Sequence, residues 1–403
     1  MIRPESRHQK RAKVQDPISG RHTAARARML SPSLIDGAVI PRASDPVDLA
    51  IGSSELTPPI FAQATDSVDG RKYSPPEGIP ALRSAIAASI QRRLGVDVDA
   101  ERHVTVTCGA TEGLLTSLMT LLEPGDEVVL FEPYYEGYLS AVRLAGGQPR
   151  FVRLHRPNWS IEPSELSGSF SVRTKAIILN SPHNPTGKVF TQEELSLILN
   201  ECYLHRAICI SDEVYDGMVF DGLQHLSPFA VAEAKPWTIL LNSMSKTYHA
   251  AGWRIGYMVT PDDLSETMRM VHGVMSYCAP EPLQTCAVSA YKLPNDYYDS
   301  LNREMQRRRD RLIDILSRAG ITAFTPRGAM YVLSDVPGRS FASDIEFTDF
   351  LLTELGIACV PGRCFYGEQK PVEDMVRFCF ARSDRTLDVV SERLGMLGDH
   401  VAL

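Results

Sequence analysis

The chain has 403 residues, of which 44% are hydrophobic and 23% charged, and its formal net charge is −7. This is the composition of an ordinary globular protein, and it excludes fibrous, collagen-like and low-complexity classes. The length is sufficient for two or three domains with large cores. Residues 1–28 carry a net charge of +6 and the remainder −13, so a basic arm precedes an acidic body. We expect the arm to be flexible and solvated, with contact to an anionic partner as the alternative.

Several classes of partner are disfavoured. An acidic body argues against a nucleic-acid surface, and no run of about 18 apolar residues indicates a membrane span. The N-terminus lacks the apolar stretch of a secretory signal. The eight cysteines include no CxxC pair and the ten histidines no HExxH motif. We therefore expect a cytoplasmic protein with reduced thiols, no metal site, and neither nucleic acid nor membrane as partner.

Short apolar runs alternate with amphipathic runs between about residues 100 and 260. The pattern predicts strands at 103–107, 127–131, 175–179, 207–211 and 238–242, and helices at 112–122 and 138–145. Nearly continuous apolar strands separated by helices are typical of a mostly parallel sheet covered on both faces, hence an α/β fold. Such a sheet binds ligands at the carboxyl ends of its strands.

The C-terminal third predicts a second, smaller α+β unit. A charged amphipathic stretch from about 285 to 318 is expected to form one long helix, with Leu301, Met305, Leu312 and Leu316 on its buried face. Its basic run is interpreted as a solvated face rather than a nucleic-acid surface. Further strands are predicted at 329–333, 356–360 and 375–380.

Two segments that follow strands have the residue types of a ligand site. Cys-Gly-Ala-Thr-Glu-Gly at 108–113 could direct backbone N–H groups and the Thr111 hydroxyl at an anion, although small residues there also serve packing. Asn-Ser-Pro-His-Asn-Pro-Thr-Gly-Lys at 180–188 is stiffened by two prolines and could hold the Asn184 amide toward a ligand. The alternative is a turn that only begins a helix at Thr191.

Two later segments add acid and base groups. Asp212 and Tyr215 end a very apolar strand, where a carboxylate needs a cationic partner, unless both lie at the surface. Lys246 follows the next strand among serines, threonine and glycine, with Arg254 eight residues later. Hydroxyl groups and an arginine form an anion cradle, and a lysine beside it is placed for Schiff-base chemistry.

Together and in this order, the motifs resemble the pyridoxal 5'-phosphate (PLP) enzymes of the aspartate aminotransferase superfamily (fold type I, class I/II), over about residues 24–397. Ser-Pro-His-Asn-Pro-Thr-Gly at 181–187 is most similar to the kynurenine, aromatic and methionine aminotransferase branch. The resemblance implies a large PLP-binding domain at 53–310 and a small domain at 29–52 and 311–403.

The resemblance also implies a role for each matching residue. Lys246 would form the Schiff base with PLP and shuttle the α-proton, while Asp212 would keep the pyridine nitrogen protonated. Asn184 and Tyr215 would hydrogen-bond the phenolic oxygen of the ring. The other implied cofactor contacts are Tyr135 stacked on the ring, Ala110, Thr111, Ser243 and Arg254 at the phosphate, and Tyr73 at the phosphate of the neighbouring subunit. Tyr73 therefore implies a homodimer.

On the substrate side, Arg377 would clamp the α-carboxylate of the amino acid, with Gly52 and Asn184 beside it. The segment Gly-Ser-Ser-Glu-Leu at 52–56 departs from the usual Gly-Glu-Pro-Asp-Phe, and no second arginine is evident for a side-chain carboxylate. Ping-pong transamination between an amino acid and a 2-oxo acid is the leading interpretation. The alternatives are another PLP reaction on this scaffold (elimination, replacement, cyclisation or oxidation) and a PLP-sensing regulator, for which the arm is too short to hold a winged helix.

Overall fold

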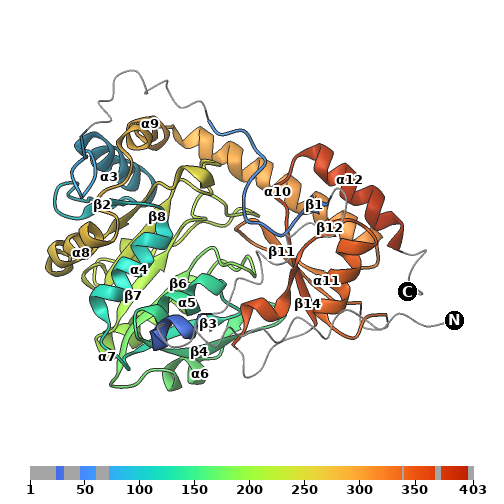
Figure 1. Cartoon of the computed structure of the whole chain (residues 1–403), viewed down its shortest axis with the longest axis horizontal. Helices are drawn as coiled ribbons and strands as arrows, with labels where there is room; N and C mark the ends of the chain where they lie inside the picture. Colours follow the sequence, from blue (N-terminus) through green and yellow to red (C-terminus); the bar gives the residue numbers. More distant parts are fainter. Residues whose placement is uncertain (1–23, 31–45, 60–71, 338–339, 368–373, 398–403) are drawn as a thin grey trace.

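The computed structural model describes residues 24–30, 46–59, 72–337, 340–367 and 374–397. Most of the predicted flexible arm therefore lies outside the described residues, and its described end contains the short helix α1 (Ala25–Arg28). Two sheets organise the rest of the chain, and Figure 1 shows them as a green-to-yellow part and an orange part joined by α10.

The larger sheet has eight strands in the order β2-β9-β8-β7-β6-β3-β4-β5. The strands are β2 (Val104–Thr107), β3 (Glu127–Glu132), β4 (Gln148–His155), β5 (Ser160–Ile161), β6 (Thr174–Asn180), β7 (Ile208–Asp212), β8 (Thr238–Ser243) and β9 (Gly256–Val259). Neighbours from β8 to β4 pair in parallel, whereas β9 is antiparallel to both β8 and β2, and β5 is antiparallel to β4. The predicted, mostly parallel α/β sheet is confirmed.

Helices cover both faces of this sheet because its strands are apolar on both sides. In β6, Ala176 and Ile178 pack with α4 (Ala110–Leu121), α5 (Glu136–Leu144) and α8 (Asp262–Met275). The alternate residues Ile177 and Leu179 pack with α6 (Pro163–Gly168) and α7 (Gln192–His205). Beside β2, α3 (Pro80–Leu94) packs on α9 (Glu281–Tyr291). Short 3₁₀ turns complete this part: η4 (Pro228–Ala230), η5 (Lys235–Trp237) and η6 (Ala251–Trp253).

The second unit contains an antiparallel sheet in the order β10-β11-β14-β13. Its strands are β10 (Ala323–Phe324), β11 (Tyr331–Asp335), β13 (Val360–Pro361) and β14 (Met375–Cys379), and its helices are α11 (Asp344–Thr353), η7 (Gly362–Phe365) and α12 (Asp384–Gly395). Near the other end of the chain, β1 (Val47–Asp48) pairs in parallel with β12 (Ile357–Ala358). Segments from both ends of the sequence thus meet in this unit.

The single helix predicted from 285 to 318 is wrong. α9 ends at Tyr291 and α10 (Asn295–Arg318) begins after Pro294, because a proline lacks an N–H and disfavours helical geometry in the residue before it. The predicted apolar face of α10 is buried, as at Met305 and Leu312. The helix runs from α9 toward α12 (Figure 1). The predicted domain boundary at residue 310 lies inside α10. The division into a large and a small domain stays a prediction.

Candidate active site

A cavity of about 380 Å³ lies where β6, β7 and β8 end, between the N-terminus of α4 and strand β14. Parallel strands bring their carboxyl ends to one edge of the sheet, which is why loops far apart in sequence meet here. Eleven of the twelve predicted site residues line this cavity: Gly52, Ala110, Thr111, Tyr135, Asn184, Asp212, Tyr215, Ser243, Lys246, Arg254 and Arg377.

Lys246 follows β8, and its Nζ donates a hydrogen bond of 2.5 Å to the carbonyl oxygen of Gly52. Burial of the ammonium group, together with the positive charges of Arg377 and Arg254, lowers its pKa to about 8, although Cys379 and Asp212 act in the opposite direction. A substantial fraction of this amine is therefore neutral near physiological pH, which is the form that attacks a carbonyl carbon.

Asp212 is the last residue of β7 and is 8% exposed. Burial raises the pKa of this carboxyl group, although hydrogen bonds from the Tyr138 hydroxyl (2.6 Å) and the Val214 N–H (3.3 Å) oppose the shift. A carboxylate at this depth needs a positive partner to remain ionised. The protonated nitrogen of a pyridine ring is a partner of the required charge.

Arg377 lies in β14 and is 1% exposed. Its Nη1 donates to Asn184 Oδ1 (2.9 Å) and its Nη2 to the Ala50 carbonyl (2.8 Å), while the guanidinium carbon lies 4.1 Å from the centre of the Tyr331 ring. Its Nε is buried without a hydrogen-bond partner among the described residues. A buried donor without an acceptor is costly, and a bound carboxylate would satisfy it.

The loop that begins α4 has the geometry of an anion cradle. Gly109, the N-cap, has φ of 84°, and a Cβ there would lie 2.3 Å from Nη2 of Arg254, so only glycine allows this approach. The unpaired N–H groups of the first turn and the helix dipole favour an anion. Ser243, Arg254 and Thr111 line the same cavity. The lysine, acid, arginine and anion cradle together fit PLP and the carboxylate of an amino acid.

Tyr73 is the one predicted residue that does not line the cavity. Its side chain is 81% exposed, and its ring lies 4.9 Å from that of Tyr277. Within one chain, Tyr73 therefore makes no contact with the site.

Two tyrosines of the cavity that were not predicted as site residues bond predicted ones through their hydroxyl groups. Tyr138 donates to Asp212, and it follows Tyr135 by three residues on α5, so helical spacing could have indicated it. Tyr331 is hydrogen-bonded to Tyr215 through their hydroxyl oxygens, 3.0 Å apart. Tyr331 begins β11, and it reaches the site because β11 pairs with β14. No local sequence signal predicts that placement.

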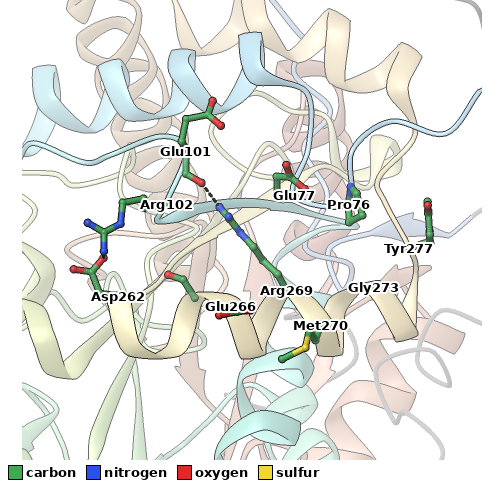
Figure 2. Close-up of a pocket in the computed structure, with 11 residues that line it drawn as sticks. Pro76, Glu77, Glu101, Arg102, Asp262, Glu266, Arg269, Met270, Gly273 and Tyr277 are labelled. Atoms are coloured by element: carbon green, nitrogen blue, oxygen red, sulfur yellow. Dashed lines mark hydrogen bonds and ion pairs between the residues drawn. The ribbon is translucent and has the colours of Figure 1, made fainter.

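A second hollow, of about 620 Å³, lies along α8 (Figure 2). Its polar groups are engaged with one another: Arg102 pairs with Asp262 at 2.9 Å, and Arg269 donates to the Glu101 carbonyl at 2.8 Å. The residues that line it include no lysine. Despite its greater volume, this hollow lacks the groups for Schiff-base chemistry.

The chain is similar to known proteins over most of its length. The family model "Aminotransferase class I and II" matches residues 45–394. Kynurenine–oxoglutarate transaminase 1 of Homo sapiens is 32% identical, and the alignment covers 87% of this chain and 92% of that relative. Methionine aminotransferase of Escherichia coli is 33% identical, and the alignment covers 81% of this chain and 84% of that relative. The structure of N-succinyldiaminopimelate aminotransferase from Mycobacterium tuberculosis aligns with a TM-score of 0.88 at 31% identity, over 93% of this chain and 100% of that one.

Proposed function

The chain belongs to the class I and II aminotransferases, PLP-dependent enzymes that transfer amino groups, and we propose that it acts on amino acids with neutral, bulky side chains. PLP supplies an electron sink that makes the α-proton of the bound amino acid acidic. The chain's own residues then decide which molecule binds, how it is oriented and where its proton goes.

The proposed roles follow from the contacts. Arg377 binds the α-carboxylate of the substrate, because its buried Nε lacks an acceptor and its guanidinium is positioned over the Tyr331 ring. Lys246 takes the α-proton on its Nζ and returns it, since its lowered pKa allows the amine to be both base and acid near neutral pH. Asp212 stays ionised beside the protonated ring nitrogen.

The phenolic side of the cofactor is assigned to Asn184 and Tyr215, and the phosphate to the first turn of α4 with Ser243 and Arg254. Asn184 is fixed by its backbone N–H, which donates to Asn180 Oδ1 (2.8 Å), and by Arg377. One arginine thus orients a cofactor ligand and binds substrate, which couples the two sites.

The lining of the cavity supports the choice of substrate. Its described arginines are Arg254 and Arg377, both already assigned to anionic groups. Ile51, Tyr135 and Tyr331 supply apolar and aromatic surface. A side-chain carboxylate would find no further cation among these residues. Kynurenine and methionine, the substrates in the names of the relatives above, both have neutral side chains.

The test is a panel of amino acids incubated with the holoenzyme and a 2-oxo acid that has a neutral side chain, with formation of the corresponding amino acid as readout. We expect aromatic, kynurenine-like and methionine side chains to react, and aspartate to react at least tenfold more slowly, the cost of a missing charge-assisted contact. The matched control is Lys246→Ala, which must be inactive. Preference for aspartate would refute the substrate proposal, and release of ammonia or peroxide without the new amino acid would refute transamination.

We also propose a homodimer that shares its sites. Tyr73 is exposed and lies against Tyr277, and Met270 and Val274 of α8 add large exposed apolar side chains (59% and 89%). Figure 2 shows Met270, Gly273 and Tyr277 along one end of α8. A surface of this kind marks a contact with another protein.

Co-expression of Lys246→Ala with Tyr73→Ala tests this arrangement. Each variant alone would be impaired, whereas a mixed dimer pairs an intact lysine with an intact tyrosine and regains activity. Failure of the mixture to exceed the two variants, or a monomer by light scattering, would refute shared sites.

A cytoplasmic location is proposed from the cysteines. All eight lie in the described part of the chain, and none is joined in a disulfide. Among the described helices, none combines the length and apolar character needed to cross a bilayer.

A further inference from the structure

A buried ion pair lies directly behind the proposed phosphate loop. Glu112 is in the first turn of α4, and its Oε1 lies 2.5 Å from Nδ1 of His272 on α8. The His272 side chain is fully buried and that of Glu112 is 9% exposed. Neither residue lines the active-site cavity, and neither has a place in the roles proposed above.

The hydrogen bonds determine the charge of His272. Its Nε2 lies 2.8 Å from the carbonyl oxygen of Pro76, which can only accept, and Nδ1 faces a carboxylate oxygen. Both ring nitrogens must therefore donate, and a neutral imidazole has one N–H only. Although burial opposes the charge, the hydrogen bond and charge of Glu112 raise the pKa of His272, and the same contacts lower the pKa of Glu112. The pair is an imidazolium and a carboxylate.

Glu112 also fixes the loop itself. Its Oε2 accepts the backbone N–H of Cys108 at 2.5 Å, and its Oε1 accepts the Ser276 hydroxyl at 2.7 Å. The carboxylate thereby holds the chain one residue before Gly109, where the anion cradle begins. The same carboxylate places a negative charge in the first turn of the helix that is proposed to bind a phosphate dianion, and like charges in a low-dielectric site repel.

We propose that His272 is a positioning residue for the cofactor phosphate: its buried imidazolium cancels the charge of Glu112, so that the carboxylate can hold the phosphate loop without repelling the phosphate. This rests on the proposed assignment of the phosphate to the first turn of α4. Through Pro76, the same cation ties the loop to the segment that carries Tyr73 (Figure 2 labels Pro76 beside α8).

The test compares four apoproteins: wild type, His272→Gln, Glu112→Gln, and the double variant. Glutamine at 272 retains an N–H donor but no charge, and glutamine at 112 retains a carbonyl acceptor. For each protein, the dissociation constants of PLP and of pyridoxal, which lacks the phosphate, are measured by absorbance titration, with thermal unfolding as a check on folding.

We expect His272→Gln to weaken PLP binding about tenfold more than pyridoxal binding, because Glu112 is then an uncompensated anion; a tenfold change is about 1.4 kcal/mol. The double variant, with the charge pair removed as a whole, should recover most of the PLP affinity. A variant that loses PLP and pyridoxal affinity equally has lost a structural contact only, and this would overturn the proposal. So would a double variant as weak as His272→Gln.

The outcome also separates this inference from the proposed function. If wild type binds PLP more tightly than pyridoxal and all variants keep that advantage, the role of His272 is refuted and the phosphate site stands. If wild type itself shows no preference for PLP over pyridoxal, the assignment of the phosphate to α4 fails, and the proposal fails with it.

Discussion

The lowered pKa of Lys246 gives a quantitative prediction about the apoprotein. With a pKa of about 8 instead of 10.5, about a tenth of the amine is neutral at pH 7, which is about 300-fold more than for an ordinary lysine. The reaction of Lys246 with an amine-selective reagent should therefore rise with pH and level off with a midpoint near 8. A pulse of acetic anhydride at a series of pH values, followed by peptide mass spectrometry, measures this midpoint. The exposed Lys175 supplies an internal reference in the same sample.

Two substitutions test the cause of the shift, because the surrounding charges act in opposite directions. At an effective dielectric constant of about 20, one neighbouring unit charge changes a pKa by about one unit, which is about 1.4 kcal/mol. Arg377→Gln removes a positive charge and should raise the midpoint of Lys246 by about one unit. Asp212→Asn removes a negative charge and should lower it.

The midpoint is the decisive quantity, because restricted access slows the reagent at every pH without moving the curve. A Lys246 midpoint in the wild-type protein at the ordinary lysine value would show that the amine is solvated and would refute the reasoning. Shifts of both variants in the same direction would show that the two charges do not act on Nζ as described.

Three further substitutions probe the walls of the site. Arg377→Lys keeps the charge but loses the planar fork, so KM for the amino acid should rise about 10–100-fold, whereas the dissociation constant of PLP should rise less, through the lost hydrogen bond to Asn184. Gly52→Ala places a Cβ 1.9 Å from the hydroxyl oxygen of Tyr331 and should lower kcat/KM, and adding Tyr331→Phe should restore part of the loss because the nearest clashing atom is gone. Tyr138→Phe removes a 2.6 Å hydrogen bond to Asp212 worth about 1.5–3 kcal/mol, and because this bond opposes the raised pKa of the acid, its loss raises that pKa further. Activity requires the ionised form and is lost as pH falls, so the acid limb of the pH–activity profile should move to higher pH.

The cofactor side of the site could be predicted from the sequence because its residues are local to strand ends. Asn184, Asp212 and Lys246 each follow a strand that is recognisable from an apolar run, and parallel pairing alone brings such ends together. The prediction needed no knowledge of how distant segments pack. The prediction of a single helix at 285–318 is wrong, because the amphipathic pattern continues across Pro294 whereas the helix does not.

The substrate side could not be predicted in the same way, because its loop is shaped by contacts across more than 300 residues of sequence. Arg382 is 1% exposed, and its guanidinium donates to the carbonyl oxygens of Asp48, Ile51 and Ser53. Arg377 holds the Ala50 carbonyl of the same segment.

A buried guanidinium must find an acceptor for each N–H, and this segment supplies them from its backbone, so its conformation depends on where β14 ends. Arg382 therefore fixes the path of the backbone next to the two serines at 53–54, which depart from the usual motif. Their hydroxyl groups can vary with the substrate while Gly52 keeps its place against Lys246. Specificity in this fold can change at the loop without disturbing the chemistry, which is why the sequence indicates the reaction more clearly than the amino acid.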